Sequence, residues 1–289
     1  MWATKNNQVK KNIMEEGMQE EEVSVLSVSA SKDAWLVAGA ILLSGVIVAA
    51  AVVLGGYMNK DVTVRTDTNT DTTQAKKDGE VTVTQDQVKA LFTDKNLAFG
   101  DKNSKVLFVE FSDPSCPYCS IASGKNPNLN KQAGAQFTLA KDGGTYIPPV
   151  PEIKKLVDAG KAGFVWVYAN GHGNGELGTK AMYCADEKKK FWEVHDLLMS
   201  EAGYKLLNET VKNDVSKADV MAEFLKSVVP VNDMKTCLTS GKYDSRLVDD
   251  MAIAKQFGFS GTPSFFVNTT RFGGAYSFKE MQSAVEGAQ

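Results

Sequence analysis

Two cysteines spaced two residues apart, in the segment Cys116-Pro117-Tyr118-Cys119, are the side chains of this sequence best suited to carry out chemistry. Cysteines at positions i and i+3 of a helix's first turn can close a small disulfide. The unpaired N–H groups and the dipole at a helix N-terminus favour a thiolate on the first sulfur. Because only a thiolate attacks a disulfide, we predict an exposed, reactive Cys116 as the nucleophile. Cys119 would then resolve the mixed disulfide.

A structural zinc site is the main alternative for a Cys-x-x-Cys segment, because half of such a site has the same spacing. A closed zinc site needs four ligands. The chain has no second Cys-x-x-Cys, and its other cysteines, Cys184 and Cys237, are isolated. Of the two histidines, His195 lies on an apolar helical stripe, which favours a structural role. We therefore expect no metal and no bound cofactor.

Glu110 is the candidate for a buried acid beside the dithiol. It lies in the run Lys105–Phe111, whose β-branched and aromatic residues predict a buried strand that leads directly into the cysteine segment. A buried carboxylate there could shuttle protons to Cys119. The other interpretation is an exposed glutamate at the edge or end of the strand.

The segment Gly261-Thr262-Pro263 supplies a third element of the site. A proline that opens a strand after a Gly-Thr turn suits a cis peptide bond, which is almost confined to X–Pro. A cis proline beside the dithiol would leave the backbone of Thr262 free to pair with a bound peptide. An ordinary trans proline at the start of a strand is the alternative.

The elements that must position these residues follow the order β-α-β, then a block of helices, then β-β-α. Half of the predicted sheet therefore precedes an all-helical insertion at about 170–257, and half follows it. We predict strands at 105–111, 164–168, 264–267 and 271–276. We predict helices at 85–94, from Pro117 onward, and at 152–159, 177–185, 188–200, 216–228, 233–239, 245–257 and 278–286.

Three blocks of the sequence resemble the DsbA-like branch of the thioredoxin superfamily. They are VLFVEFSDPSCPYC, AMYCADEKKKFWEVHDLL and CLTSGKYDSRLVDDMAIAKQFGFSGTPSFFVN. The resemblance covers roughly residues 104–289 and implies a thioredoxin-like α/β fold interrupted by a helical domain. It assigns Cys116 as the attacking cysteine, Cys119 as its partner, Glu110 as the buried acid and Pro263 as the cis-proline. The chain differs at Tyr118, where the best-known oxidants of this family carry His.

The resemblance also implies an activity and partners. We expect a thiol–disulfide oxidoreductase that acts on reduced secreted proteins, with Thr262, Pro263, Pro117 and Tyr118 contacting the substrate. A quinone-linked thiol oxidase of the membrane would reoxidise it. A reductase or isomerase on the same fold, or a non-catalytic peptide-binding holdase, are the alternatives.

The remaining cysteines, Cys184 and Cys237, fall in two different helices of the predicted insertion. The even number of cysteines and a location outside the cytoplasm favour a structural disulfide between them. Two buried free thiols are the alternative, because free cysteine is a common core residue.

An uncharged apolar run within the first 80 residues predicts a membrane anchor. The run Ala34–Met58 contains no charged side chain and has Trp35 and Tyr57 near its ends. As a helix it would span about 37 Å, enough to cross a bilayer core. We predict a cytoplasmic tail at 1–33, a transmembrane helix at 34–58, a flexible linker at 59–80 and an extracytoplasmic domain at 81–289.

Composition limits the remaining function classes. The chain has 289 residues, of which 43% are hydrophobic and 23% charged, as in ordinary globular proteins. Its formal net charge of -3 offers no basic surplus for a phosphate backbone. We therefore expect no nucleic acid among its partners.

Overall fold

The computed structural model describes residues 81–288. The predicted tail 1–33, transmembrane helix 34–58 and linker 59–80 lie outside the described residues. Within residues 81–288, no helix is both long and apolar enough to cross a membrane.

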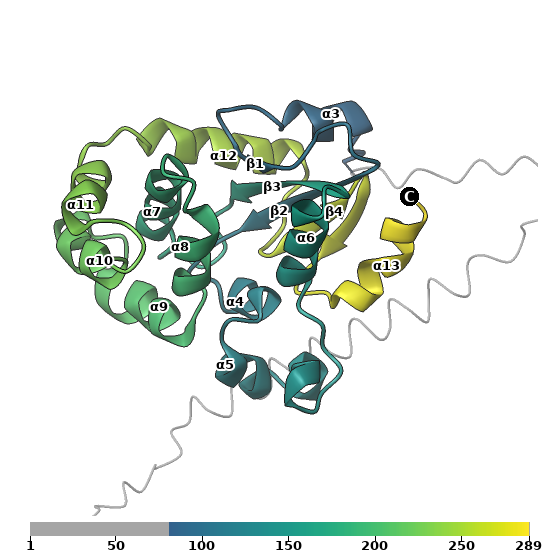
Figure 1. Cartoon of the computed structure of the whole chain (residues 1–289), viewed down its shortest axis with the longest axis horizontal. Coiled ribbons are helices and arrows are strands. Elements are labelled where there is room, and N and C mark those ends of the chain that lie inside the picture. The colour runs from purple at the N-terminus through teal and green to yellow at the C-terminus, as the bar shows by residue number, and fades with distance from the viewer. Residues whose placement is uncertain (1–80, 289) are drawn as a thin grey trace, which may run out of the picture. The chain divides into compact units, whose positions relative to one another are not determined.

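A five-stranded sheet forms the centre of the domain (Figure 1). Its strand order is β1-β3-β2-β4-β5, in which β2 and β3 run parallel and the other neighbouring pairs run antiparallel. The strands are β1 Leu97–Phe99, β2 Val106–Ser112, β3 Ala162–Tyr168, β4 Ser264–Val267 and β5 Thr270–Gly273. Because β2 is the middle strand, the segment that follows it lies at the centre of one edge of the sheet.

Strands β2 and β3 are buried along their whole length, since helices cover both faces of the sheet. Alternate residues contribute to two separate hydrophobic clusters. Leu107, Val109 and Phe111 pack on the face covered by α3 and α12. Val106 and Phe108 pack on the opposite face, against α4, α6, α13 and the helical insertion.

The helices before the insertion are α3 Gln85–Ala90, α4 Pro117–Ser123, α5 Pro127–Gln132 and α6 Pro149–Asp158, with short 3-10 turns at Ala135–Phe137 and Ala140–Asp142. Between β3 and β4 the chain forms helices only, which gather beside one end of the sheet except for α12, which lies across it (Figure 1). They are α7 Glu176–Asp186, α8 Phe191–Leu198, α9 Glu201–Lys205, a π-helical turn at Leu206–Val211, a 3-10 turn at Val215–Lys217, α10 Ala218–Phe224, α11 Val231–Thr239 and α12 Asp244–Gln256. The last helix is α13 Phe278–Glu286.

Several element boundaries differ from the sequence predictions; for example, the helix predicted at 216–228 is α10 Ala218–Phe224 and the strand predicted at 271–276 is β5 Thr270–Gly273. Two further differences have clear local reasons. The helix predicted at 85–94 ends at Ala90, because the Asn96 side chain donates a hydrogen bond to the carbonyl of Leu91 (2.7 Å) and the chain then enters β1. The helix predicted at 188–200 begins only at Phe191, because Lys189 adopts a left-handed conformation (φ 57°). The three-residue strand β1 was not predicted, and its brevity gives it no clear periodicity.

Candidate active site

The dithiol lies where β2 gives way to α4. Cys116 is the N-cap residue of α4, and Pro117 occupies the first helical position, which it favours because it lacks an N–H. Cys119 lies one turn further in and is fully buried. Its Sγ accepts a hydrogen bond from the backbone N–H of Asp113 (3.4 Å).

The pKa values of the two thiols are shifted in opposite directions. A hydrogen bond from the Cys119 thiol lowers the pKa of Cys116 from 9.0 to about 6; burial opposes this shift, and the backbone N–H groups of Cys119 and Tyr118 add to it. Burial raises the pKa of Cys119 well above 9.0, and the negative charge of a Cys116 thiolate raises it further. Near neutral pH the pair therefore holds its negative charge on Cys116.

Cys116 is less accessible than the sequence suggested. Its residue surface is only 4% exposed, and it packs with Cys119 and Met199. The expectation of an exposed nucleophile was wrong because Met199, at the end of α8, covers the dithiol from the insertion side. The loop that contains Thr262 closes on it from the other side.

The Thr262–Pro263 peptide bond is cis. Strand β4 pairs antiparallel with β2, with Ser264 opposite Phe111, so the preceding turn lies beside the start of the dithiol segment. The carbonyl oxygen of Thr262 lies 3.5 Å from Cys116 Sγ. Thr262 is half-buried and Pro263 buried.

Glu110 is fully buried on the central strand β2, and neither of its carboxyl oxygens has a hydrogen-bond partner within the described protein. Burial raises the pKa of Glu110 from 4.5 to about 7. Its position alternates with Val109 and Phe111, so it faces the same side of the sheet as α4. It interacts electrostatically with Cys119.

Asp113 is a site residue that the sequence analysis missed. Its buried carboxylate accepts hydrogen bonds through Oδ1 from the Ser115 N–H (2.8 Å) and hydroxyl (2.6 Å). Through Oδ2 it accepts from the N–H groups of Gly171 (3.0 Å) and His172 (2.8 Å). It therefore fastens the turn before Cys116 to the loop after β3. The sequence signal was the Asp-x-Ser spacing, which is typical of a side chain that caps its own turn.

Two glycines of that loop are required by close approach. A Cβ atom at Gly171 would lie 1.7 Å from Thr262 Oγ1, and one at Gly175 would lie 1.9 Å from Asp113 Oδ1. The glycine-rich loop after β3 therefore packs against both the Thr262 turn and the Asp113 turn.

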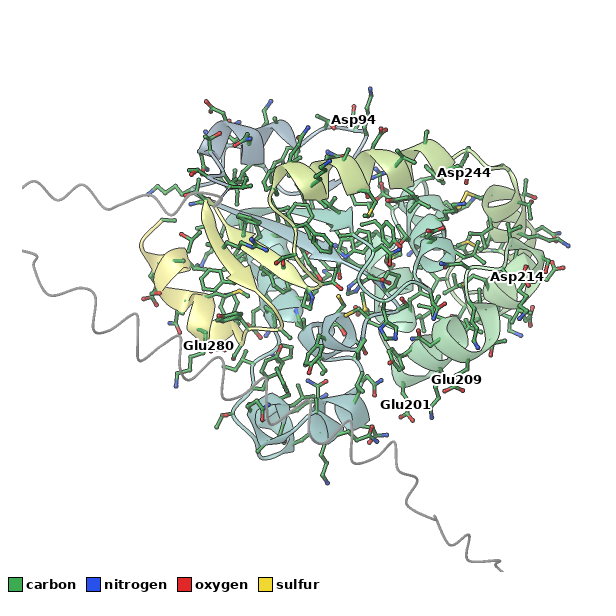
Figure 2. The ribbon with its side chains drawn as sticks, turned by 180° about the vertical axis from the view of Figure 1, so that it is seen from behind. Asp94, Glu201, Glu209, Asp214, Asp244 and Glu280 are labelled. Atoms are coloured by element: carbon green, nitrogen blue, oxygen red, sulfur yellow. A yellow bond between two sulfur atoms is a disulfide. The ribbon has the colours of Figure 1, made fainter. Side chains whose placement is uncertain are left out.

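A cavity of about 480 Å³ lies beside the dithiol. Tyr118, which is 47% exposed, contributes to its lining and makes an edge contact with Phe137 (5.8 Å between ring centroids). The lining also includes Tyr146, Thr262, Tyr276 and Glu280. Figure 2 labels Glu280 on α13, the last helix of the chain. The cavity therefore adjoins both the dithiol segment, through Tyr118, and the cis-proline turn, through Thr262.

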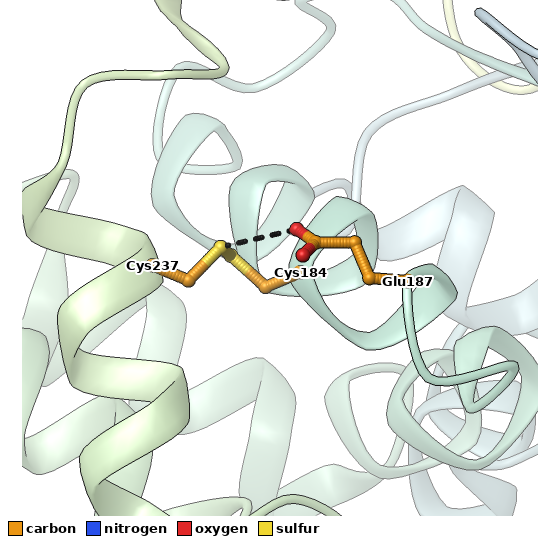
Figure 3. Close-up of side chains that lie close together, drawn as sticks. All are labelled: Cys184, Glu187 and Cys237. Carbon is orange, nitrogen blue, oxygen red and sulfur yellow. Dashed lines mark hydrogen bonds between the residues drawn. A yellow bond between two sulfur atoms is a disulfide. The ribbon is translucent and has the colours of Figure 1, made fainter.

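Cys184 on α7 and Cys237 on α11 form a disulfide (Figure 3). Glu187 Oε1 lies 3.6 Å from Cys237 Sγ, and these three side chains form a potential metal-ligand cluster among the described residues. The two sulfurs are bonded to each other and so offer no thiolates to a metal. The disulfide joins two helices of the insertion.

The fold and the site define a thioredoxin-like protein with a redox-capable dithiol. A family model described as Thioredoxin matches residues 151–287, a range that contains the cis-proline turn and the insertion and begins after the dithiol. The crystal structure of oxidised BdbD from Bacillus subtilis covers 67% of this chain and 92% of its own, at 18% identity and a TM-score of 0.50. This likeness supports the fold.

Two curated relatives extend across the dithiol region. A Rickettsia felis protein that carries the provisional name protein-disulfide oxidoreductase is 24% identical over 199 residues, which are 68% of this chain and 60% of that protein. The Na(+)/H(+) antiporter NhaA 3 of Salinispora tropica is 25% identical over 198 residues, which are 68% of this chain and 25% of the antiporter. The chain thus spans less than two thirds of the length of either relative. The chain is therefore similar to thioredoxin-like proteins and to proteins named protein-disulfide oxidoreductases, and it shares the thioredoxin-like fold.

Proposed function

We propose that this protein is a membrane-anchored, extracytoplasmic thiol–disulfide oxidoreductase that donates disulfides to reduced secreted or envelope proteins. The observation that carries the proposal is the asymmetry of the dithiol: the pKa of Cys116 is lowered to about 6, whereas burial raises that of Cys119. A stable thiolate on Cys116 favours the reduced state of the protein, and this makes its disulfide a better oxidant.

The proposed reaction begins with the oxidised Cys116–Cys119 pair. A substrate thiolate attacks Cys116 Sγ, the Cys116–Cys119 bond breaks, and the electron pair leaves on Cys119 Sγ. Glu110, which is protonated below a pKa of about 7, gives its proton to that thiolate. A second substrate thiolate then attacks the substrate sulfur of the mixed disulfide. The substrate leaves oxidised, and Cys116 is left as a stabilised thiolate.

The backbone of the cis-proline turn supports the proposed substrate contacts. The Thr262 carbonyl faces Cys116, and the cavity lined by Tyr118 and Tyr276 continues from it. An extended substrate segment would lie along this surface with its cysteine at Cys116, and Pro117 and Pro263 would shape its walls.

Anchoring and partners extend the proposal to the whole protein. The uncharged run Ala34–Met58 would hold the domain at the membrane, with the N-terminus cytoplasmic. A quinone-linked thiol oxidase in the same membrane would reoxidise the dithiol. Protease added outside cells whose outer envelope is permeable should digest the domain, and protection until the inner membrane is broken would contradict this orientation.

The reduction potential of the Cys116–Cys119 pair tests the proposed direction. The full chain is equilibrated with glutathione redox buffers, and the fraction of oxidised dithiol is measured by thiol labelling. A reduction potential of about -120 mV supports a disulfide donor, whereas a potential of about -270 mV indicates a reductase. A Cys116→Ser variant should fail to oxidise a reduced, unfolded protein. Full activity of that variant would favour the non-catalytic holdase.

A further inference from the structure

Within residues 81–288, several buried polar atoms without a hydrogen-bond partner lie on the face of the sheet that Glu110 shares with α8. Besides the Glu110 carboxylate, they include Trp166 Nε1 and His195 Nε2. Trp166 is the register neighbour of Glu110 on the adjacent strand β3. Buried polar atoms are rarely left without partners, and bridging water is the usual one. Glu110, Trp166 and His195 therefore form a row of polar groups, called the polar path below, inside an otherwise apolar core.

His195 occupies the outer end of this path. Its side chain is only 1% exposed, and the rings of Phe191 and Trp192 pack against it at 5.6 and 5.8 Å. Its Nδ1 lies 3.1 Å from Asp196 Oδ1. The Asp196 side chain is 38% exposed and forms an ion pair with Lys125. The imidazole thus has one nitrogen toward a surface carboxylate and one unpartnered nitrogen in the core.

The contact with Asp196 determines the role of the inner nitrogen. A carboxylate that accepts from Nδ1–H fixes the imidazole in the tautomer whose Nε2 is a proton acceptor. His195 and Glu110 also interact electrostatically. His195 thus has an acceptor nitrogen, Nε2, inside the core and a second nitrogen, Nδ1, in contact with the partly exposed Asp196. Because it also interacts with Glu110, it is suited to transfer protons between that carboxyl group and the surface.

We propose that His195 is a positioning residue that connects Glu110 to solvent by passing protons between the buried carboxyl group and Asp196. The inference rests on the proposed dithiol function. It goes beyond that function by assigning the route through which Glu110 is reprotonated, since the carboxyl group itself has no exposure to water.

The proton balance is closed over one redox cycle. The cycle starts from the reduced protein described here, in which the Cys116 and Cys119 thiols are free and His195 carries its proton on Nδ1. When the dithiol is oxidised, Glu110 passes its proton to Nε2, Nδ1 releases its proton to Asp196, and the Glu110 carboxylate takes the proton of Cys119. When the dithiol is next reduced, Glu110 protonates the Cys119 thiolate and recovers a proton from Nε2, while Nδ1 takes one from the Asp196 side. One inward and one outward transfer restore the starting tautomer of His195.

Among the residues that the structure describes, few other titratable groups face this path. Glu110 interacts with Cys119 on α4 and with Tyr146, whose hydroxyl donates to the carbonyl of Ala275. Burial raises the pKa of Tyr146 above its usual value, so it stays protonated and cannot replace His195. On the outer side His195 meets Asp196, and Asp196 meets Lys125.

The reaction of the reduced full chain with oxidised glutathione tests the proposal, because it separates attack by Cys116 from attack by Cys119. First the Cys116 thiolate attacks glutathione disulfide, forms a mixed disulfide and releases one glutathione. Then Cys119 loses its proton to Glu110, attacks Cys116 Sγ and releases the second glutathione. Samples quenched in acid and weighed by mass spectrometry give both rates, at several pH values and in both H₂O and D₂O.

We expect His195→Gln to leave the first step unchanged and to slow the second about tenfold, with a larger solvent isotope effect. Asp196→Asn, a surface change that keeps the fold, should slow the second step by a smaller factor. Glu193→Gln, which removes an exposed carboxylate on the same helix α8, is the matched control and should leave both steps unchanged.

Different results would overturn different claims. A second step with the wild-type rate in both His195→Gln and Asp196→Asn would overturn the relay. Equal slowing of both steps would show that His195 serves only the fold, and would also overturn it. Failure of the wild-type chain to form a Cys116 mixed disulfide would instead refute the proposed dithiol function.

Discussion

The Sγ atom of Cys116 lies 3.5 Å from the carbonyl oxygen of Thr262, a residue 146 positions further along the chain. The contact exists because β4 pairs with the central strand β2, which brings the cis-proline turn to the N-terminus of α4. The nucleophile candidate and the backbone that would align a substrate are thus held by one sheet. The long helical insertion between them does not disturb this relationship.

The acidity of Cys116 can be measured directly. We expect its thiolate to form with a midpoint near pH 6, so that the alkylation rate rises through that pH and levels off above it. Cys119→Ala should move the midpoint upward, because the hydrogen bond from Cys119 is the largest cause of the lowered pKa. The alkylation rate of the full chain against pH is the measurement, with Cys116→Ser as the blank. A midpoint near pH 9 would contradict the thiolate assignment.

Glu110 should make the stability of the protein fall as pH rises. Its folded-state pKa of about 7 is above the ordinary value of 4.5, so the folded protein holds a proton that the unfolded chain loses. The stability from this group is complete below pH 4.5 and disappears as pH rises through 7. Across that window wild type should lose about 3 kcal/mol relative to Glu110→Gln.

Urea unfolding of both proteins at pH 4.5 and pH 8 checks this expectation. The difference between their unfolding free energies should change with pH in favour of the glutamine variant. A difference that stays constant between the two pH values would mean that Glu110 titrates normally.

Asp113 should contribute more to the free energy of unfolding than Asp214, an exposed aspartate that makes similar hydrogen bonds. Asp113→Ala leaves four donors around the site without their acceptor, and we expect it to cost about 2–4 kcal/mol of unfolding free energy. Asp214, labelled on the surface of the insertion in Figure 2, makes the same pair of bonds to Ser216 but is exposed. Asp214→Ala is therefore the matched control. Chemical denaturation should separate the two, and equal losses would argue against the proposed fastening role of Asp113.

The Cys184–Cys237 disulfide should contribute to stability and not to the reaction. It closes a loop with a sequence separation of 53 residues, so replacing both cysteines with alanine should lower the unfolding free energy by about 2–4 kcal/mol. The titration midpoint of Cys116 should stay unchanged in the double variant, which serves as the internal control. A shifted midpoint would show that the insertion disulfide tunes the active site.

The sequence by itself determined the local elements of the site. The apolar run before Cys116 and the proline after it predict a strand that leads into a helix, and β2 and α4 have that arrangement. Capping residues and helical periodicity predict the last helix, and α13 spans the expected residues 278–286. These features depend on neighbours a few positions away, so periodicity and capping are sufficient to find them.

Only the tertiary structure decided how the site is closed. The burial of Glu110 in the central strand, the four bonds to Asp113 and the cover of Met199 over Cys116 depend on which elements pack together. The pairing of Cys184 with Cys237 likewise depends on the packing of α7 against α11. Helix packing joins Cys184 to Cys237 across 53 positions, and strand register brings Cys116 to Thr262 across 146 positions. Local propensity carries no information about contacts at those separations. The sequence therefore identified the reactive groups, and the fold determined their acidity and access.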